Sequence, residues 1–367
     1  MTFTPNSSTK TGDHSQPSKK AKIVLKGMSL EMIQEWAINQ GQTKYRGTQL
    51  FEWMYRHGIQ KTNKMTNISG SFRKFLEENC DLMTLEIDKI TEEISEPTCK
   101  ILFKTRDNHF IETVSMLDRK RHTVCLSSQI GCSLGCTFCA TATMGLIRNL
   151  TAGEIVDQLI WVRNLVDEPV TNIVFMGMGE PFLNYNRVMQ AADIFHHERG
   201  FNLASSRITI STAGIVPKIS QFITEKRRYK LAISLNAPDN LVRNQIMPIN
   251  EEWNIKNIVA TGKLFSNQPR REVMFEYVLI KGVNDREKDA IKLGRLLKGI
   301  NCKLNIIPYN EFNGKYHRPS DSEIEKFMQI LYDQQGKCRV LIRWSKGKNI
   351  SAACGQLATN NIGKQVI

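Results

Sequence analysis

Three cysteines lie close together in the segment GCSLGCTFCATATMG, which spans residues 131–145. Cys132, Cys136 and Cys139 have the spacing CxxxCxxC in a short loop that contains glycine. Thiolates at such spacing are typical metal ligands, and cysteine sites usually provide four of them, around a tetrahedral zinc ion or at the corners of an iron–sulfur cluster. The sequence therefore raises the question of what fills the fourth position.

Three interpretations of the cysteine loop are open from spacing alone. The thiols can be ordinary buried side chains. They can bind zinc together with a distant fourth ligand, His122 or Cys125, although structural zinc sites usually have paired ligands such as CxxC or HxxxH and the chain has no second pair. They can also hold a four-iron cluster with one iron left open to a substrate or a cofactor.

Polar and small residues follow the predicted strands of the chain. After the cysteine loop, short apolar strands alternate with helices, which predicts βα units and a parallel sheet, arranged as a partial or full barrel or as an open doubly wound sheet. Five motifs stand at strand ends, namely the cysteine loop, GMGEP after NIVFM, STAG after RITI, SLNA after KLAI and YNEF after NIIP. Because active sites of parallel sheets lie at the carboxyl ends of the strands, these motifs predict one pocket and an enzyme.

The positions of helices and strands suggest how the chain is divided. The expected parts are a disordered basic tail (1–27), a helical accessory domain (28–83), a small β segment (84–117), the α/β core (118–348) and a C-terminal segment (349–367). Ser29 is the expected cap of the first helix, and a capping box of Thr151 and Glu154 begins a helix in the core. Further core helices are expected near residues 285–299 and 320–335.

Composition favours a nucleic-acid partner. The 367 residues are 41% hydrophobic and 23% charged, and 50 basic against 36 acidic residues give a formal charge of +14. Such a surplus favours a polyanionic partner. The tail lysines are expected to contact phosphates without sequence specificity; they are Lys10, Lys19, Lys20, Lys22 and Lys26.

The chain shows no sign of membrane insertion or secretion. It has no apolar run long enough for a membrane span, and its N-terminal residues lack the apolar stretch of a signal peptide. We therefore expect a cytoplasmic protein without a membrane partner. Nine cysteines, an odd number in this setting, also argue against a disulfide framework.

The cysteine loop resembles the signature of the radical S-adenosylmethionine (SAM) superfamily, which has an aromatic residue before the last cysteine, here Phe138. The resemblance implies a partial (β/α)6-type barrel and one [4Fe-4S] cluster per chain, with SAM on the fourth iron through its amino and carboxylate groups. Glycine lets backbone approach such a ligand, and a carboxylate can bind its ammonium group. The expected SAM contacts are Gly179, Glu180, Ser211, Ser234, Leu235, Asn236 and Asn310.

Longer motifs resemble the RlmN/Cfr family of RNA methyltransferases over roughly residues 28–358. They are CLSSQIGCSLGCTFCATATMG, FMGMGEPFLN, ISTAGIVP, LAISLNAP, MPIN, GVND and AACGQL. RlmN enzymes methylate carbon 2 of an adenosine in the peptidyl-transferase centre of 23S rRNA and of the adenosine next to the anticodon in some tRNAs. Cfr enzymes methylate carbon 8 of the same rRNA adenosine. Pro181 in GEP favours the RlmN branch, because Cfr relatives tend toward GEA.

The resemblance also assigns roles to residues that the pattern alone would place in the core or on the surface. It implies that Cys354 in AACGQL carries the methyl group, that Cys125 helps to release the product, and that the two finish as a disulfide. Glu112 in FIETV matches a proposed proton acceptor. The resemblance further implies that the protein uses two SAM molecules per turnover and an electron donor such as flavodoxin or ferredoxin. It also implies a monomer that acts on 23S rRNA and tRNA.

The sequence leaves the role of Asn236, the type of reaction and the roles of four cysteines open. Asn236 stands where many relatives have histidine, which allows a ribose contact but no acid–base role. A radical SAM enzyme that transfers no methyl group would not need Cys125 and Cys354, and a zinc-containing RNA-binding protein would hold zinc without sulfide. Four cysteines match no motif, namely Cys80, Cys99, Cys302 and Cys338.

Overall fold

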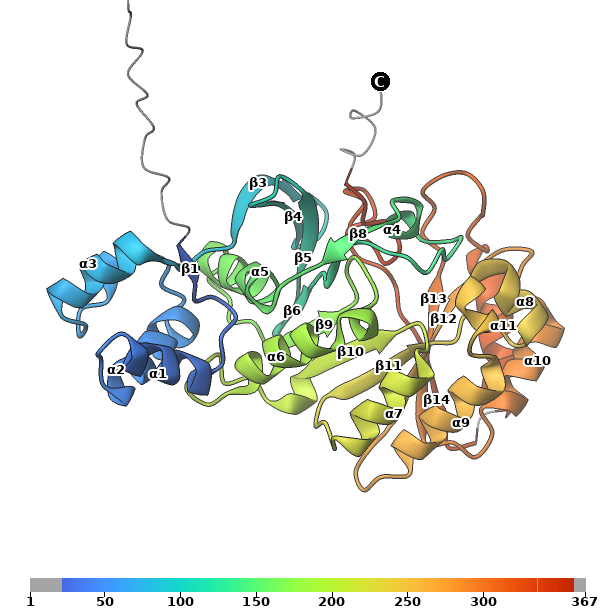
Figure 1. The fold of residues 1–367 in the computed structure, drawn as a ribbon. Coiled ribbons are helices and arrows are strands. Elements are labelled where there is room, and N and C mark those ends of the chain that lie inside the picture. Colours follow the sequence, from blue (N-terminus) through green and yellow to red (C-terminus); the bar gives the residue numbers. More distant parts are fainter. Residues whose placement is uncertain (1–21, 335, 360–367) are drawn as a thin grey trace, which may run out of the picture.

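The computed structural model describes residues 22–334 and 336–359. Ten strands form one sheet in the order β14–β13–β12–β11–β10–β9–β6–β5–β4–β3 (Figure 1). Within this sheet the strands β6, β9, β10, β11, β12, β13 and β14 pair in parallel, each beside the next strand of this set along the chain. A doubly wound sheet needs a point where this order reverses. The order therefore corresponds to the predicted partial barrel, open between the edge strands β14 and β3.

Six βα units build the parallel part. In chain order its elements are β6 (Arg121–Cys125), α5 (Ala152–Leu165), β9 (Asn172–Phe175), α6 (Tyr185–His196), β10 (Ile208–Thr212), α7 (Val216–Thr224), β11 (Lys230–Ser234), α8 (Asn240–Ile246), α9 (Ile255–Ser266), β12 (Val273–Leu279), α10 (Glu287–Leu296), β13 (Cys302–Pro308), α11 (Asp321–Gln334) and β14 (Arg339–Ile342). The capping box of Thr151 and Glu154 is present at the start of α5. The helices predicted near residues 285–299 and 320–335 are α10 and α11, whereas α8 and α9 were not predicted.

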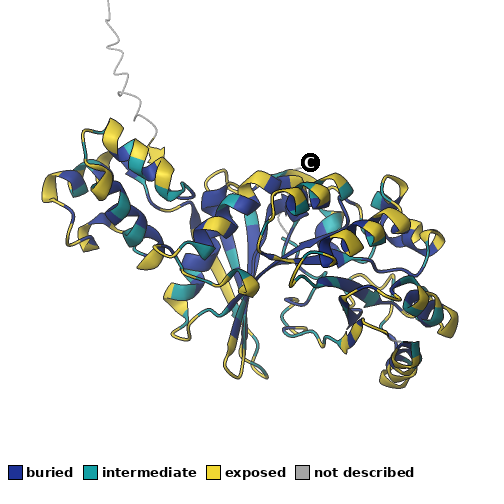
Figure 2. Cartoon of the chain, turned by 90° about the horizontal axis from the view of Figure 1, so that it is seen from below, coloured by how far each residue is buried: buried dark blue, intermediate teal, exposed yellow. Residues whose placement is uncertain are grey.

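Three antiparallel strands extend the sheet beyond β6. They are β3 (Leu85–Glu92), β4 (Thr98–Thr105) and β5 (Phe110–Asp118), and β5 pairs with both β4 and β6. The β segment expected at residues 84–117 is thus continuous with the core sheet, and the expected boundary falls inside β5. Figure 2 shows that the strands are mostly buried while the outer faces of the helices are exposed.

The helical domain contains α1 (Leu30–Asn39), α2 (Lys44–Phe51), a π-helical turn (Glu52–Arg56), a 3-10 turn (Thr62–Lys64) and α3 (Gly70–Asn79). The Ser29 side chain caps α1 by accepting a hydrogen bond from Met32 N at 3.3 Å, as predicted. Strand β1 (Ile23–Val24) pairs with β2 (Cys80–Asp81) at the end of this domain.

The predicted tail ends earlier than residue 27. Leu25 is fully buried, and Lys26 Nζ lies 3.3 Å from Asp157 Oδ1 on α5 with both side chains inaccessible to solvent. The expectation that Lys26 contacts phosphates is therefore wrong, because its charge is used inside the protein. Lys22 Nζ donates a hydrogen bond to Glu77 O. Lys10, Lys19 and Lys20 lie outside the described residues.

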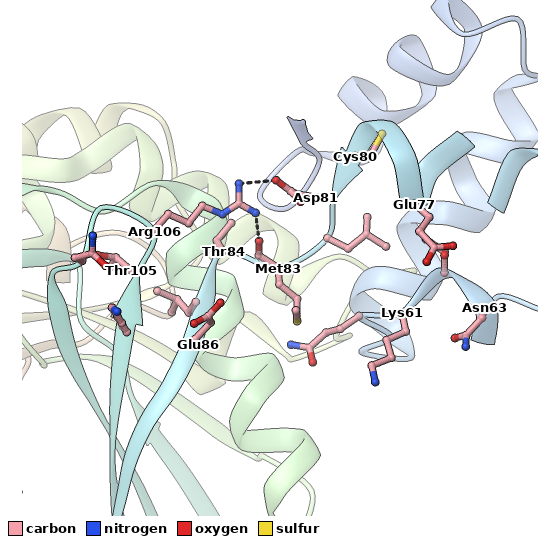
Figure 3. A pocket seen from close by; sticks show the side chains of 16 residues that line it. Lys61, Asn63, Glu77, Cys80, Asp81, Met83, Thr84, Glu86, Thr105 and Arg106 are labelled. Carbon is pink, nitrogen blue, oxygen red and sulfur yellow. Dashed lines mark hydrogen bonds and ion pairs between the residues drawn. The ribbon is translucent and has the colours of Figure 1, made fainter. Parts of the chain in front are cut away.

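A groove of about 650 Å³ separates the helical domain from the amino-terminal part of the sheet (Figure 3). Arg106 spans part of it, since Nη1 lies 2.8 Å from Asp81 Oδ2 and Nη2 donates to Met83 O. Lys61, Lys104 and Arg106 line this groove together with Glu77, Asp81 and Glu86. Equal numbers of acidic and basic side chains give the groove no preference for a polyanion.

No helix among the described residues has the length and apolar character needed to cross a membrane.

Candidate active site at the carboxyl ends of the parallel strands

The cysteine loop is fixed at its base by backbone hydrogen bonds. Strand β7 (Gln129–Gly131) pairs with β8 (Leu146–Asn149), and the short helix α4 (Ala140–Thr143) follows the third cysteine. Cys132 N donates to Gly145 O at 2.8 Å. Gly131 has a φ of 74°, and a Cβ there would overlap Gly145 O, so only glycine permits this closure.

One cavity collects most of the residues predicted for the site. The predicted residues that line it are Cys132, Cys136, Cys139, Gly179, Glu180, Ser211, Ser234, Asn236, Asn310 and Cys354. They come from the cysteine loop, from the ends of four parallel strands and from the C-terminal segment. The prediction that the strand-end motifs form one pocket is confirmed. Leu235 is different, because its side chain is fully buried outside the lining and its carbonyl accepts from Arg243 Nε.

The three thiols suit a cluster better than a single zinc ion. Among the described residues, no three His, Cys, Asp or Glu side chains converge on one metal-ion position. Tetrahedral zinc requires that convergence, whereas each sulfur of a cubic cluster binds its own iron. Of the candidate fourth ligands, His122 uses both ring nitrogens, with Nε2 2.7 Å from Ser115 Oγ and Nδ1 2.8 Å from Glu168 O. Cys125 lies in a different cavity.

Burial keeps the free thiols protonated. It raises the pKa of Cys132 to about 11 and also raises the pKa values of Cys136 and Cys139. A bound cluster would reverse this, because its iron ions stabilise thiolates. Arg243 is fully buried behind the loop, and its positive charge acts on Cys136. The donor set and this cation therefore fit a cluster held by thiolates.

The GMGEP turn places a buried carboxylate on the other side of the cavity. Gly179 has a φ of 94°, and a Cβ there would overlap Gln129, so this glycine serves packing against the chain as well as an approach to ligand. Glu180 Oε2 accepts from Ala213 N at 2.7 Å and Oε1 accepts from Phe182 N at 2.9 Å. Burial raises the pKa of Glu180 to about 7. A ligand ammonium group would favour the ionised form.

The polar side chains predicted at the other strand ends differ in whether they are free to bind a ligand. Asn236 Oδ1 accepts from Val278 N at 2.9 Å and its Nδ2 lies 3.3 Å from Met247 Sδ, so this side chain already holds β12 in place. Asn310 Nδ2 donates to Cys354 O at 3.0 Å, while its buried Oδ1 has no hydrogen-bond partner in the part of the chain that the structure describes. A buried amide oxygen without a partner is costly. Asn310 is therefore the better placed of the two to accept a hydrogen bond from a ligand.

The segment that carries Cys354 is tied directly to the cysteine loop. Ala140 N donates to Gly355 O at 2.7 Å, and Thr141 Oγ1 donates to Leu357 O at 2.6 Å. These bonds place the residues next to Cys139 and Cys354 in contact, although they are far apart in the sequence.

Glu112 and Lys100 hold the same segment from the sheet. Glu112 Oε2 accepts from Ala358 N at 3.0 Å, Lys100 Nζ donates to Ser351 O at 3.2 Å, and the two side chains form an ion pair at 2.8 Å. Burial raises the pKa of Glu112 even though Lys100 opposes the shift. The side chain is 6% exposed, in contrast to the solvent-exposed strand position that the pattern alone suggests. Glu112 lines neither cavity of the site.

A second cavity of about 670 Å³ borders the first one at Cys354 and Met176, which line both. Cys125, at the end of β6, lines this second cavity together with Cys354. Burial raises the pKa of Cys125 to about 12, with the nearby Cys354 as the second cause. Arg343 Nη1 lies 3.3 Å from Glu276 Oε1, and its charge acts on both cysteines. The two cysteines thus line one cavity together with a cation.

Several site residues were missed from the sequence. Glu276 accepts from Ser211 Oγ at 3.1 Å, and a charged residue inside the apolar strand REVMFEYVLI was a signal for it. Arg243, Arg343 and Lys100 had no comparable signal.

Two sequence models of protein families match the chain. The model described as the radical SAM superfamily matches residues 126–294, and the one described as the ribosomal RNA large subunit methyltransferase N-terminal domain matches residues 23–82.

Curated proteins and a solved structure are similar over most of the chain. A dual-specificity RNA methyltransferase RlmN of Geotalea uraniireducens is 40% identical, covering 92% of this chain and 96% of its own. A probable enzyme of the same name from Staphylococcus aureus is 38% identical, covering 92% and 93%. The crystal structure of a radical SAM methyltransferase from Sphaerobacter thermophilus superposes with a TM-score of 0.88 at 41% identity, covering 91% of this chain and 99% of that chain.

Proposed function

Because the chain belongs to the RlmN family of radical SAM RNA methyltransferases, we propose that it methylates carbon 2 of adenosine. The proposed substrates are the adenosine in the peptidyl-transferase centre of 23S rRNA and the adenosine next to the anticodon in tRNAs. Relatives named as dual-specificity enzymes support this choice, and so does Pro181 in GEP. The observation that carries the proposal is the shared cavity of Cys125 and Cys354, which meets the cavity of the cysteine loop at Cys354.

Cys132, Cys136 and Cys139 are the proposed ligands of the four-iron cluster that the family requires. When reduced and bound to SAM, a cluster held by these residues would supply the carbon radical that abstracts hydrogen. Glu180 binds the ammonium group of SAM and Asn310 Oδ1 accepts from the adenine amino group. Arg243 offsets part of the negative charge of the three thiolates.

Cys354 is the proposed intermediate acceptor of the methyl group. Carbon 2 of adenine and the methyl group of SAM are both electrophilic, so direct transfer between them is unfavourable. Cys354 Sγ first accepts the methyl group, which then loses one hydrogen atom to the SAM-derived radical, and the resulting carbon radical bonds to the base. The single electron left on this adduct when the ring proton departs would be taken up by the bound cluster. Cys125 takes the ring proton and then attacks Cys354 Sγ, which releases the methylated base and leaves a disulfide.

Lys100 and Glu112 hold Cys354 in position, because their contacts at Ser351 and Ala358 lie on either side of it. A role of Glu112 as a proton acceptor requires in addition that its ion pair with Lys100 opens. The proposal further includes two SAM molecules per turnover, flavodoxin or ferredoxin as electron donor, and action as a monomer.

Mass spectrometry of nucleosides tests the proposed function. The reconstituted protein is incubated with SAM, a reductant and unmodified 23S rRNA, and the RNA is then digested. We expect 2-methyladenosine from the wild type and from Cys99→Ala, a cysteine outside both cavities, and none from Cys354→Ala. Methylation at carbon 8 would instead support the Cfr-like alternative, and unmethylated RNA would contradict both.

A further inference from the structure

The second cavity continues from the two cysteines to the opposite end of the sheet. Arg121, Thr123 and Cys125 alternate along β6 and all line it, so they share the inner face of the sheet. At the amino ends of the parallel strands the charged lining residues are Arg121, Lys230 and Lys303, together with Asp118, which lies opposite Arg121 on β5. With a rise of about 3.3 Å per residue, Arg121 lies about 13 Å along the strand from Cys125.

The amino end of this cavity carries an excess of positive charge. Glu272 is shared by Lys303 at 2.8 Å and Arg339 at 3.3 Å, and Asp118 pairs with Lys346 at 3.4 Å. None of the ion pairs formed by the described residues includes Arg121 or Lys230, and both side chains are exposed. Partial desolvation of its ammonium group first, and then the charges of Lys303, Arg121 and Arg207, lower the pKa of Lys230. An anion bound at this amino end of the cavity, which we call the rim, would relieve the repulsion between these positive charges.

We propose that this cavity admits a low-molecular-weight thiol bearing carboxylates, which reduces the Cys125–Cys354 disulfide left by each turnover. The inference rests on the proposed function, since that function creates the disulfide. The cavity volume of about 670 Å³ is within the range of pockets that hold small organic ligands. The rim attracts the carboxylates, Thr209 lies beside Lys230 at the rim, and Thr123 and Asn305 add polar groups to the wall of the cavity.

Reduction of the Cys125–Cys354 disulfide consumes two thiol groups of the reductant. The first thiolate attacks Cys125 Sγ, forms a mixed disulfide and releases Cys354 as a thiolate beside the Arg343 guanidinium. The second attacks the reductant's sulfur in the mixed disulfide and releases the Cys125 thiolate. Two protons from the reductant's thiols restore both cysteines. In total, two thiols lose two electrons and become one small disulfide, while the protein disulfide is reduced.

RNA is the competing occupant of this rim, because phosphates also bind lysine and arginine. The two possibilities separate in a single turnover with enzyme whose cysteines are already reduced. Under the proposal this turnover needs no thiol in the cavity, so neutralising the rim leaves it unchanged. If the rim bound RNA instead, the same change would slow methylation.

The test compares Arg121→Gln/Lys230→Gln with Arg187→Gln/Lys298→Gln, which removes the same charge from exposed positions outside both cavities. After one turnover with RNA, the Cys125–Cys354 disulfide is measured by differential alkylation and mass spectrometry. Its reduction is then followed with mercaptosuccinate, an anionic thiol, and with uncharged 2-mercaptoethanol.

We expect the rim variant to slow reduction by mercaptosuccinate at least about tenfold, the effect of losing a charge-assisted contact. Reduction by 2-mercaptoethanol and single-turnover methylation should stay within about twofold of wild type, and the control variant should match wild type throughout. Equal rates with mercaptosuccinate would overturn the inference, as would slowed single-turnover methylation, which assigns the rim to RNA. Absence of any disulfide after turnover would overturn the proposed function and this inference with it.

Discussion

The Asp157→Asn variant should be strongly destabilised, because it leaves the charge of Lys26 buried without a counter-ion. The two side chains are inaccessible to solvent and 3.3 Å apart. Removing one partner of such a pair typically costs about 3–5 kcal/mol of folding free energy. Lys26 limits the cost by losing its proton, and neutralising a lysine of ordinary pKa 10.5 costs about 5 kcal/mol at pH 7. Asparagine can still accept from Thr84, which donates N and Oγ1 hydrogen bonds to Asp157 Oδ2.

Urea unfolding of three proteins measures this effect. Asp157→Asn should lose about 3–5 kcal/mol at pH 7, and Lys26→Met/Asp157→Asn should regain most of it, because no buried cation remains. In the single variant the lysine is neutral when folded and protonated when unfolded, so folding releases a proton. Its stability should therefore rise by about 1.4 kcal/mol per pH unit between pH 7 and 10, relative to the double variant. A loss below about 1 kcal/mol, or a double variant no more stable than the single one, would refute the reasoning.

Three further predictions concern the site and RNA binding. Replacing Cys132, Cys136 or Cys139 by alanine should abolish the bound cluster of about four irons, and retention of full iron by any variant would show a wrong ligand. Since burial raises the pKa of Glu180 to about 7, SAM must displace its proton, so affinity should fall about fivefold from pH 7 to pH 6. Glu180→Gln should bind SAM weakly without this dependence, and an unchanged affinity would refute the ammonium contact. Affinity for RNA should fall steeply with salt, with a slope reduced by up to about 2–3 when residues 1–20 are deleted, and a flat response would contradict phosphate binding.

The sequence predicted the parts of the site that depend on local spacing and strand topology. The cysteine loop is contiguous, and the GMGEP, STAG and SLNA motifs each follow an apolar strand of a parallel sheet. The carboxyl ends of parallel strands lie at the same edge of a sheet. This topology alone therefore predicts that Glu180, Ser211 and Ser234 lie in one cavity. The alternation of strands and helices left a barrel and a doubly wound sheet open, and the resemblance of the motifs to radical SAM enzymes selected the partial barrel.

The contacts that sequence reasoning missed join residues distant in the chain. Lys100 with Ser351 and Lys26 with Asp157 have no local pattern that pairs them. The lysine-rich stretch around Lys26 favours a disordered basic tail, although the apolar residues of IVL just before it indicate an ordered segment. Asn236 lines the cavity predicted for SAM, and its φ of 57° and its hydrogen bond from Val278 N depend on how β11 and β12 pack. Such features appear only when tertiary structure is known.

The most direct test of the two-cysteine account is the fate of RNA on Cys125→Ala. This variant keeps Cys354 and the cluster ligands, so it should accept the methyl group and bond to the base. It lacks the thiol that takes the ring proton and attacks Cys354 Sγ. We predict a covalent protein–RNA species that, after nuclease digestion, leaves a nucleotide on the peptide containing Cys354, with no adduct in Cys354→Ala. Normal turnover by Cys125→Ala, or loss of activity without an adduct, would contradict the account.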